Sequence, residues 1–140
     1  MNNYRVGFTC GAFDLFNAGH VVMLRNARRQ CDYLIVGIQT DPTIDRPTKN
    51  KPIQSIVERQ LEVGACRYVD SIVIYETESE LHELLETLPI NVRFVGMDHK
   101  DGFTSGVDIC KRRGIQEIYS ERGGRYSTSE LRERIKNDNH

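Results

Sequence analysis

The segment at residues 10–20 reads C-G-A-F-D-L-F-N-A-G-H, and the rest of the chain is organised around it. An apolar run at 4–9 precedes this segment, and apolar residues at helical spacing follow it from Val21. A glycine turn leading from a strand into a helix points backbone N–H groups at the helix N-terminus, where phosphate binds favourably. We therefore expect a phosphate site here, with Asn17 at the helix entrance and His20 in its first turn.

Length and composition indicate one globular domain spanning residues 1–140, because the chain is too short for two comfortable cores. The formal net charge of -1 argues against nucleic acid as a partner. No apolar run approaches the roughly 20 residues of a membrane span, and the first residues lack a signal-peptide pattern. The four cysteines are far apart with no C-x-x-C pair, so we expect free thiols and a cytoplasmic protein.

Strand-like and helix-like apolar patterns alternate strictly along the chain. The expected strands are 6–10, 33–38, 72–75, 92–95 and 115–119. The expected helices are 19–31, 55–65, 77–88, 107–113 and one that starts at 127, with Leu131 and Ile135 facing inward. Such alternation predicts an α/β fold, a three-layer Rossmann-like parallel sheet of about five strands with helices on both faces.

The unusual loops follow the first, second, fourth and fifth strands, which places them all at the carboxyl edge of the sheet. Ligands of doubly wound sheets bind at that edge, where the winding reverses. The sequence therefore predicts one site to which all four loops contribute.

Two common nucleotide motifs, G-x-G-x-x-G and G-x-x-x-x-G-K-[ST], do not occur, so the residues do not favour a dinucleotide-binding or P-loop protein. Instead, G-A-F-D-x-x-N-x-G-H at 11–20 resembles the first motif of nucleotidyltransferases with an H-x-G-H signature. It is similar above all to the glycerol-3-phosphate cytidylyltransferase motif G-T-F-D-x-x-H-x-G-H. A second segment at 122–129, R-G-G-R-Y-S-T-S, is similar to the family's R-T-E-G-I-S-T-[TS]. The resemblance covers nearly the whole chain and implies nucleotidyltransferase (HUP-type) topology.

In the reaction that the resemblance implies, an acceptor phosphate attacks the α-phosphorus of a nucleoside triphosphate, and pyrophosphate leaves. The protein holds the groups in line and stabilises the developing charge, with His20 donating to the α-phosphate. The catalytic residues implied are His20, Arg122, Lys49 and Lys51. Nucleotide-binding residues would be Gly11, Ala12, Phe13, Asp14, Asn17, Gly19, His20, Asp98, Arg122, Tyr126, Ser127 and Thr128. The acceptor would contact Lys49, Lys51 and Arg67. Mg²⁺ would be bound with the triphosphate rather than in a protein cage.

The first loop leaves alternatives open at two positions. Asn17 stands where the nearest family pattern has histidine; its amide can donate but cannot be cationic. Asparagine is also among the best N-cap residues, and the phosphopantetheine branch of the superfamily has threonine there. By resemblance Asp14 orients the loop through hydrogen bonds, and a simple Asx-turn is the alternative.

Each of the other candidate residues also has an interpretation that involves no ligand. Ser127 could only begin a helix, whereas the fork of Arg122 suits the β- and γ-phosphates. Lys49 and Lys51 could lie in a solvated turn, and Asp98 could be an exposed turn carboxylate. Arg67 could pair with Asp70 instead of a ligand.

These observations predict a cytidylyltransferase that makes a CDP-alcohol and pyrophosphate from CTP and a small phosphorylated alcohol. Glycerol 3-phosphate is the first-choice acceptor, followed by phosphoethanolamine or phosphocholine. The alternatives are an adenylyltransferase of the same fold acting on another phosphorylated metabolite and a catalytically silent nucleotide-binding protein. The resemblance also implies a homodimer.

Overall fold

A computed structural model describes residues 3–96, 104–120 and 128–138. The strands are β1 (Val6–Gly11), β2 (Tyr33–Gln39), β3 (Ser71–Tyr75), β4 (Val92–Gly96) and β5 (Gln116–Ser120). The helices are α1 (Ala18–Arg28), the 3₁₀ turn η1 (Pro42–Ile44), α2 (Ile56–Gly64), α3 (Glu78–Thr87), α4 (Val107–Arg113) and α5 (Thr128–Asn137). The predicted alternation is confirmed, with boundaries shifted by a few residues at most strand and helix ends.

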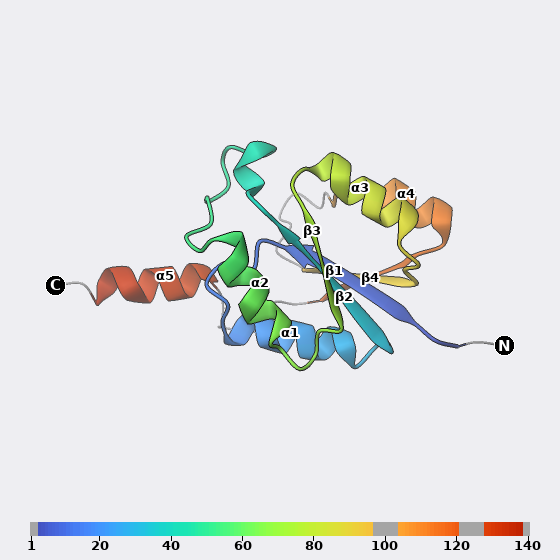
Figure 1. Ribbon diagram of the computed structural model, residues 1–140, viewed down its shortest axis with the longest axis horizontal. Coiled ribbons are helices and arrows are strands. Elements are labelled where there is room, and N and C mark those ends of the chain that lie inside the picture. Colours follow the sequence, from blue (N-terminus) through green and yellow to red (C-terminus); the bar gives the residue numbers. More distant parts are fainter. Residues whose placement is uncertain (1–2, 97–103, 121–127, 139–140) are drawn as a thin grey trace.

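The five strands form one parallel sheet in the order β3-β2-β1-β4-β5. β1 therefore lies at the centre, and the winding reverses between β1 and β4. Helices α1 and α2 cover one face, and α3 and α4 cover the other (Figure 1). The loop after β1 consequently leaves the sheet at the topological switch point, where ligands of such folds bind.

Side chains of β2 enter the core on both faces of the sheet. Leu34, Val36 and Ile38 pack against the α1 and α2 side, and Ile35 packs on the α3 and α4 side with Phe8 of β1. This two-sided burial explains why the strand reads as a continuous apolar run rather than an alternating one.

Short polar side chains hold the amino edge of the sheet. Asn91 Oδ1 accepts a hydrogen bond from the N–H of Val6 at 2.7 Å, and Asp70 Oδ2 accepts one from the N–H of Leu34 at 2.8 Å. Arg28 Nε also donates to Asp70 Oδ2 at 2.9 Å. The starts of β1 and β2 are thus tied to the segments before β4 and β3.

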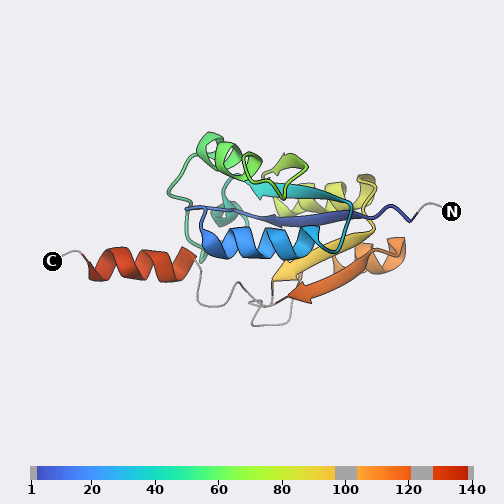
Figure 2. The ribbon, with the colours of Figure 1, turned by 90° about the horizontal axis from the view of Figure 1, so that it is seen from below.

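Helix α5 differs from the prediction. It projects from the body of the domain (Figures 1 and 2), and Ile135, which we expected to face inward, is 60% exposed. Val57 and Leu61 of α2 are exposed as well. The prediction failed because an amphipathic pattern shows which face of a helix is apolar but not which surface covers it. Among the described residues, none covers the apolar side chains of Ile135 on α5 or of Val57 and Leu61 on α2. In the described part of the chain, no helix has the length and apolar character to cross a membrane.

Candidate functional site

The loop between β1 and α1 adopts an uncommon backbone conformation. Phe13 has φ 54° and Leu15 has φ 51°, so the backbone of two residues with large side chains is in the left-handed region. Such a backbone persists only where surrounding contacts hold it. The ring of Phe13 is buried in the core beside α1 and helps to hold this backbone conformation. The polar contacts of the loop supply the other restraints.

A reciprocal cap fixes the start of α1. Asn17 Oδ1 accepts from the N–H of Gly19 at 2.9 Å, and the N–H of Asn17 donates to Nδ1 of His20 at 3.2 Å. Because Nδ1 is the acceptor, the neutral imidazole carries its proton on Nε2. Phe16 stacks on this ring at 5.5 Å between centroids, and Phe13 lies tilted against it at 5.3 Å. This hydrogen bond and the two aromatic rings are described contacts that help to orient His20.

The amide group of Asn17 links the two ends of the chain. Nδ2 donates to the carbonyl of Leu15 at 2.9 Å and to Oγ1 of Thr128 at 3.0 Å. The capping role that we considered for Asn17 is confirmed. Its contact with a phosphate stays a prediction, but Thr128, the first residue of α5, does lie beside the loop as the two motifs required.

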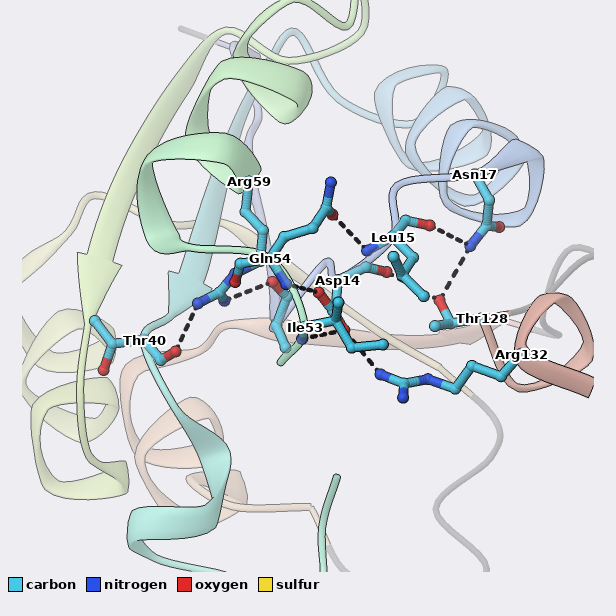
Figure 3. A network of polar contacts seen from close by, with 10 residues as sticks. Asp14, Leu15, Asn17, Thr40, Ile53, Gln54, Arg59, Thr128 and Arg132 are labelled. Carbon is cyan, nitrogen blue, oxygen red and sulfur yellow. Dashed lines mark hydrogen bonds and ion pairs between the residues drawn. The ribbon is translucent and has the colours of Figure 1, made fainter. Parts of the chain in front are cut away.

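Asp14 joins three segments of the chain (Figure 3). Its Oδ2 accepts from the N–H of Ile53 and its Oδ1 from the N–H of Gln54, both at 2.9 Å, and Arg132 Nη2 of α5 donates to Oδ2 at 2.8 Å. The side chain of Gln54 accepts in turn from the N–H of Leu15 at 2.7 Å. Asp14 thus orients the loop through bonds to distant residues, as the resemblance implied, and not as a local Asx-turn.

The sequence did not point to Arg59, which is the buried cation of this edge. The side chain is 2% exposed and donates to the carbonyls of Ala12 at 2.9 Å, Gln39 at 2.6 Å and Thr40 at 2.6 Å. A fourth bond runs from Nε to the carbonyl of Gln54 at 3.2 Å. Burial lowers the pKa of Arg59, although an arginine this far above neutrality stays charged.

A signal for Arg59 was present in the helical pattern. The residue lies three positions after Ile56 and four before Val63, both of which face the sheet, so it belongs to the inward stripe of α2. An arginine on that stripe predicts a buried cation with backbone or carboxylate partners.

The two lysines of the proline-rich loop occupy different positions. A hollow of about 450 Å³ lies between the end of β2 and the start of α2, and Lys51 is among its lining residues together with Thr40, Asp41 and Glu58. Lys49 is exposed on the neighbouring turn, where its N–H donates to the carbonyl of Arg46. Lys51 therefore lines a hollow at this edge of the sheet, and contact of either lysine with a ligand stays a prediction.

Arg67 lies apart from the other predicted site residues. It follows α2 and precedes β3, which places it at the amino edge of the sheet, and its guanidinium lies 5.9 Å from the ring centroid of Tyr68. Asp70, the alternative partner that we considered, bonds Arg28 instead. Within one chain the structure does not bring Arg67 to the loop between β1 and α1 (residues 12–17), called the phosphate loop for its predicted role, so its contact with the acceptor gains no support.

The remaining predicted residues divide into two groups. Gly11 ends β1, Ala12 binds Arg59 through its carbonyl, and Gly19 is buried in the first turn of α1. Asp98, Arg122, Tyr126 and Ser127 lie outside the described residues, and their roles stay predictions. Within 3–96, 104–120 and 128–138, no group of three or more His, Cys, Asp or Glu side chains could hold a metal ion.

Comparison with known proteins supports the resemblance to nucleotidyltransferases that the two sequence motifs indicated. The family model described as "Cytidylyltransferase-like" matches residues 8–134. The chain is 35% identical over 136 residues to the "Bifunctional protein HldE" of Campylobacter jejuni, covering 96% of this chain and 28% of that protein. It is 39% identical over 132 residues to a "Probable ethanolamine-phosphate cytidylyltransferase" of Encephalitozoon cuniculi, covering 90% of this chain and 38% of that protein. The chain therefore spans about a third of the length of these relatives.

Solved structures show the same fold at low sequence identity. A lipopolysaccharide core biosynthesis protein from Thermoplasma volcanium aligns with a TM-score of 0.68 at 18% identity, covering 84% of this chain and 95% of that one. Pantothenate synthetase from Thermus thermophilus aligns with a TM-score of 0.59 at 11% identity, covering 86% of this chain and 57% of that one. These likenesses confirm the predicted fold, an α/β parallel sheet covered by helices.

Proposed function

The chain belongs to the cytidylyltransferase-like family of nucleotidyltransferases, and from that membership we propose that it transfers CMP from CTP to a small phosphorylated alcohol and releases pyrophosphate. The observation that supports this proposal most directly is the contact between the two motifs. Asn17 Nδ2 lies 3.0 Å from Thr128 Oγ1, although 111 residues separate them in sequence. Two helix N-termini thus meet at the switch point of the sheet, an arrangement suited to a chain of phosphates.

The proposed reaction proceeds by in-line displacement. An oxygen of the acceptor phosphate forms a bond to the α-phosphorus of CTP, while the bond to the bridging oxygen breaks and the electron pair leaves with pyrophosphate. His20 donates from Nε2 to an α-phosphate oxygen, because Nδ1 already accepts from the backbone of Asn17. Phe13 and Phe16 hold the imidazole in place, so the donor needs no reorganisation as charge develops.

Two further cations support the proposal. Arg59 is buried directly beneath the loop, where its charge adds to the positive potential of the α1 N-terminus. Lys51 lines the adjacent hollow, where it can bind the acceptor phosphate. We propose that Mg²⁺ enters with the triphosphate, whose oxygens suit it.

The hollow also bears on the choice of acceptor. Hydrogen bonds from the side chain and backbone of Thr43 hold the pKa of Asp41 below its ordinary value, and bonds from Ser55 lower the pKa of Glu58. The lining carries two ionised carboxylates and two cations, Lys51 and the buried Arg59, so it offers both signs of charge to an acceptor with a phosphate at one end and an ammonium at the other. We therefore propose phosphoethanolamine ahead of glycerol 3-phosphate, reversing the order expected from the motifs. The name of the Encephalitozoon cuniculi relative agrees with this order.

A pyrophosphate-release assay tests the proposal. The protein is supplied with CTP, ATP, GTP or UTP, each with phosphoethanolamine, phosphocholine or glycerol 3-phosphate. Turnover that requires CTP and prefers phosphoethanolamine supports the full proposal, and a preference for glycerol 3-phosphate overturns the acceptor order alone. ATP-only turnover favours the adenylyltransferase alternative, and nucleotide binding without turnover favours a silent binding protein. The homodimer stays a prediction that sedimentation of the same preparation can test.

A further inference from the structure

Helix α5 is attached to the body of the domain through its amino-terminal half. Thr128 Oγ1 donates to the carbonyl of Asp14 at 3.2 Å and accepts from Asn17. Arg132, one turn later on the same face, donates to Asp14 Oδ2 at 2.8 Å (Figure 3). The far half of the helix projects away, with Ile135 exposed. In the described part of the chain, Thr128 and Arg132 therefore make the hydrogen bonds that fix α5 against the β1–α1 loop.

Of these two attachments, the one made by Arg132 is charged. Asp14 is 7% exposed, and its carboxylate receives two backbone N–H bonds from Ile53 and Gln54. A carboxylate this buried is costly without an opposite charge within contact distance, and Arg132 supplies that charge from α5. Its side chain is 30% exposed, so solvent screens the pair only in part. One ion pair thus ties α5 to both loops that border the proposed site.

We infer that Arg132 is a positioning residue of the nucleotide site: its ion pair with Asp14 sets the first turn of α5 against the Asn17 and His20 end of α1 before nucleotide binds. This inference rests on the proposed function, because it concerns the affinity of the same site. Without the pair, the two neutral bonds of Thr128 remain among the described bonds between α5 and the β1–α1 loop. The first turn of α5 is then in place in only a fraction of the free molecules. The apparent affinity for nucleotide equals the intrinsic affinity multiplied by that fraction.

The expected effect is on nucleotide affinity rather than on chemistry. Arg132→Leu should raise the KM for CTP by about five- to twentyfold, which is near or below the low end of the roughly 13- to 150-fold expected for one charge-assisted hydrogen bond, because solvent partly screens this pair. The value of kcat should change by less than about threefold, because saturating CTP restores the turn. Arg132→Lys retains the charge without the fork and should lie between the wild type and the leucine variant.

The matched control lies two residues away on the same helix. Arg134 is 62% exposed and pairs with Glu130 of α5 at 3.6 Å. Arg134→Leu removes the same charge from α5 but leaves Asp14 untouched, so its KM for CTP should stay within about twofold of the wild type. An equal rise in both leucine variants would overturn the inference, because net charge and not position would then explain it. A KM for CTP unchanged in Arg132→Leu would overturn it directly.

A second measurement separates this inference from the proposed function. Amide hydrogen exchange across residues 128–137, measured without nucleotide, should be at least about tenfold faster in Arg132→Leu than in the wild type and unchanged in Arg134→Leu. This readout requires no turnover. If the wild type turns over no nucleotide, the proposed function fails while the exchange test still decides the role of Arg132. Equal exchange in Arg132→Leu and the wild type would overturn the inference whatever the activity.

Discussion

Replacing Arg59 by methionine should destabilise the protein more than an ordinary substitution does. Its guanidinium binds four carbonyls, those of Ala12, Gln39, Thr40 and Gln54. Methionine fills much of the space of the stem but donates to none of them. The end of β1, the end of β2 and the segment before α2 would then lose the group that connects them.

The magnitude follows from two opposing effects. Hydrogen bonds from a charged donor contribute about 1.5–3 kcal/mol each, so four bonds suggest about 6–12 kcal/mol. Burying the guanidinium costs several kcal/mol, which the variant recovers. The net loss in unfolding free energy should therefore be about 3–5 kcal/mol, a large part of the roughly 5–15 kcal/mol typical of a domain. Arg59→Lys retains the charge and should lose about 2 kcal/mol.

Urea unfolding at pH 7, followed by circular dichroism, measures these losses. Arg29→Met is the matched control, because Arg29 is exposed just after α1 and its replacement should cost below about 0.5 kcal/mol. A loss below about 1 kcal/mol for Arg59→Met, with an unchanged denaturant slope, would show that water satisfies the carbonyls. The buried cation would then not be the connector that its four bonds suggest.

Three other predictions concern the same edge and the core. His20→Ala should lower kcat by on the order of 10²–10³-fold in the pyrophosphate assay, and an unaffected rate would remove His20 from the chemistry. Asn17→Asp should retain the helix cap but lose the two bonds that Nδ2 donates to Leu15 and Thr128, so the melting temperature should fall. The KM for CTP should rise at least about tenfold, because a carboxylate opposes phosphate, and an unchanged KM would contradict a phosphate beside Asn17. Burial raises the pKa of the Cys31 and Cys110 thiols above 9.0 and the pKa of the Tyr75 phenol above 10.0. The folded protein retains these protons longer than the unfolded chain, so stability should be full below about pH 9 and fall above it, and equal urea midpoints at pH 8 and pH 10 would refute this.

Much of the fold followed from local patterns. The continuous apolar run of β2 indicated a strand buried on both faces, and the capping box of Ser55 and Glu58 is present with bonds of 2.9 and 3.2 Å. The place of Asn17 and His20 at the start of α1 also followed, because a glycine turn between a strand and a helix has few geometries. These features depend on residues close together in sequence.

The features that sequence reasoning missed depend on tertiary partners. Leu131 and Ile135 define an apolar face on α5, but spacing does not say which surface covers it, and the helix projects instead. Arg59 is charged and therefore reads as exposed unless its position on the inward stripe is weighed first. The bond between Asp14 and Arg132 joins residues 118 positions apart, and neither residue type indicates the other.

The polar side chains at the amino edge have a consequence for how this domain tolerates change. Asn91 and Asp70 keep the starts of the strands in register at the end of the sheet opposite the phosphate loop. Exchange of the residues around the hollow leaves those anchors untouched. Strengthening contacts at the anchored edge can offset stability lost at the other, because distant sites act nearly additively. Substitutions around the proposed site can therefore be screened while their stability losses are offset at the opposite end of the sheet.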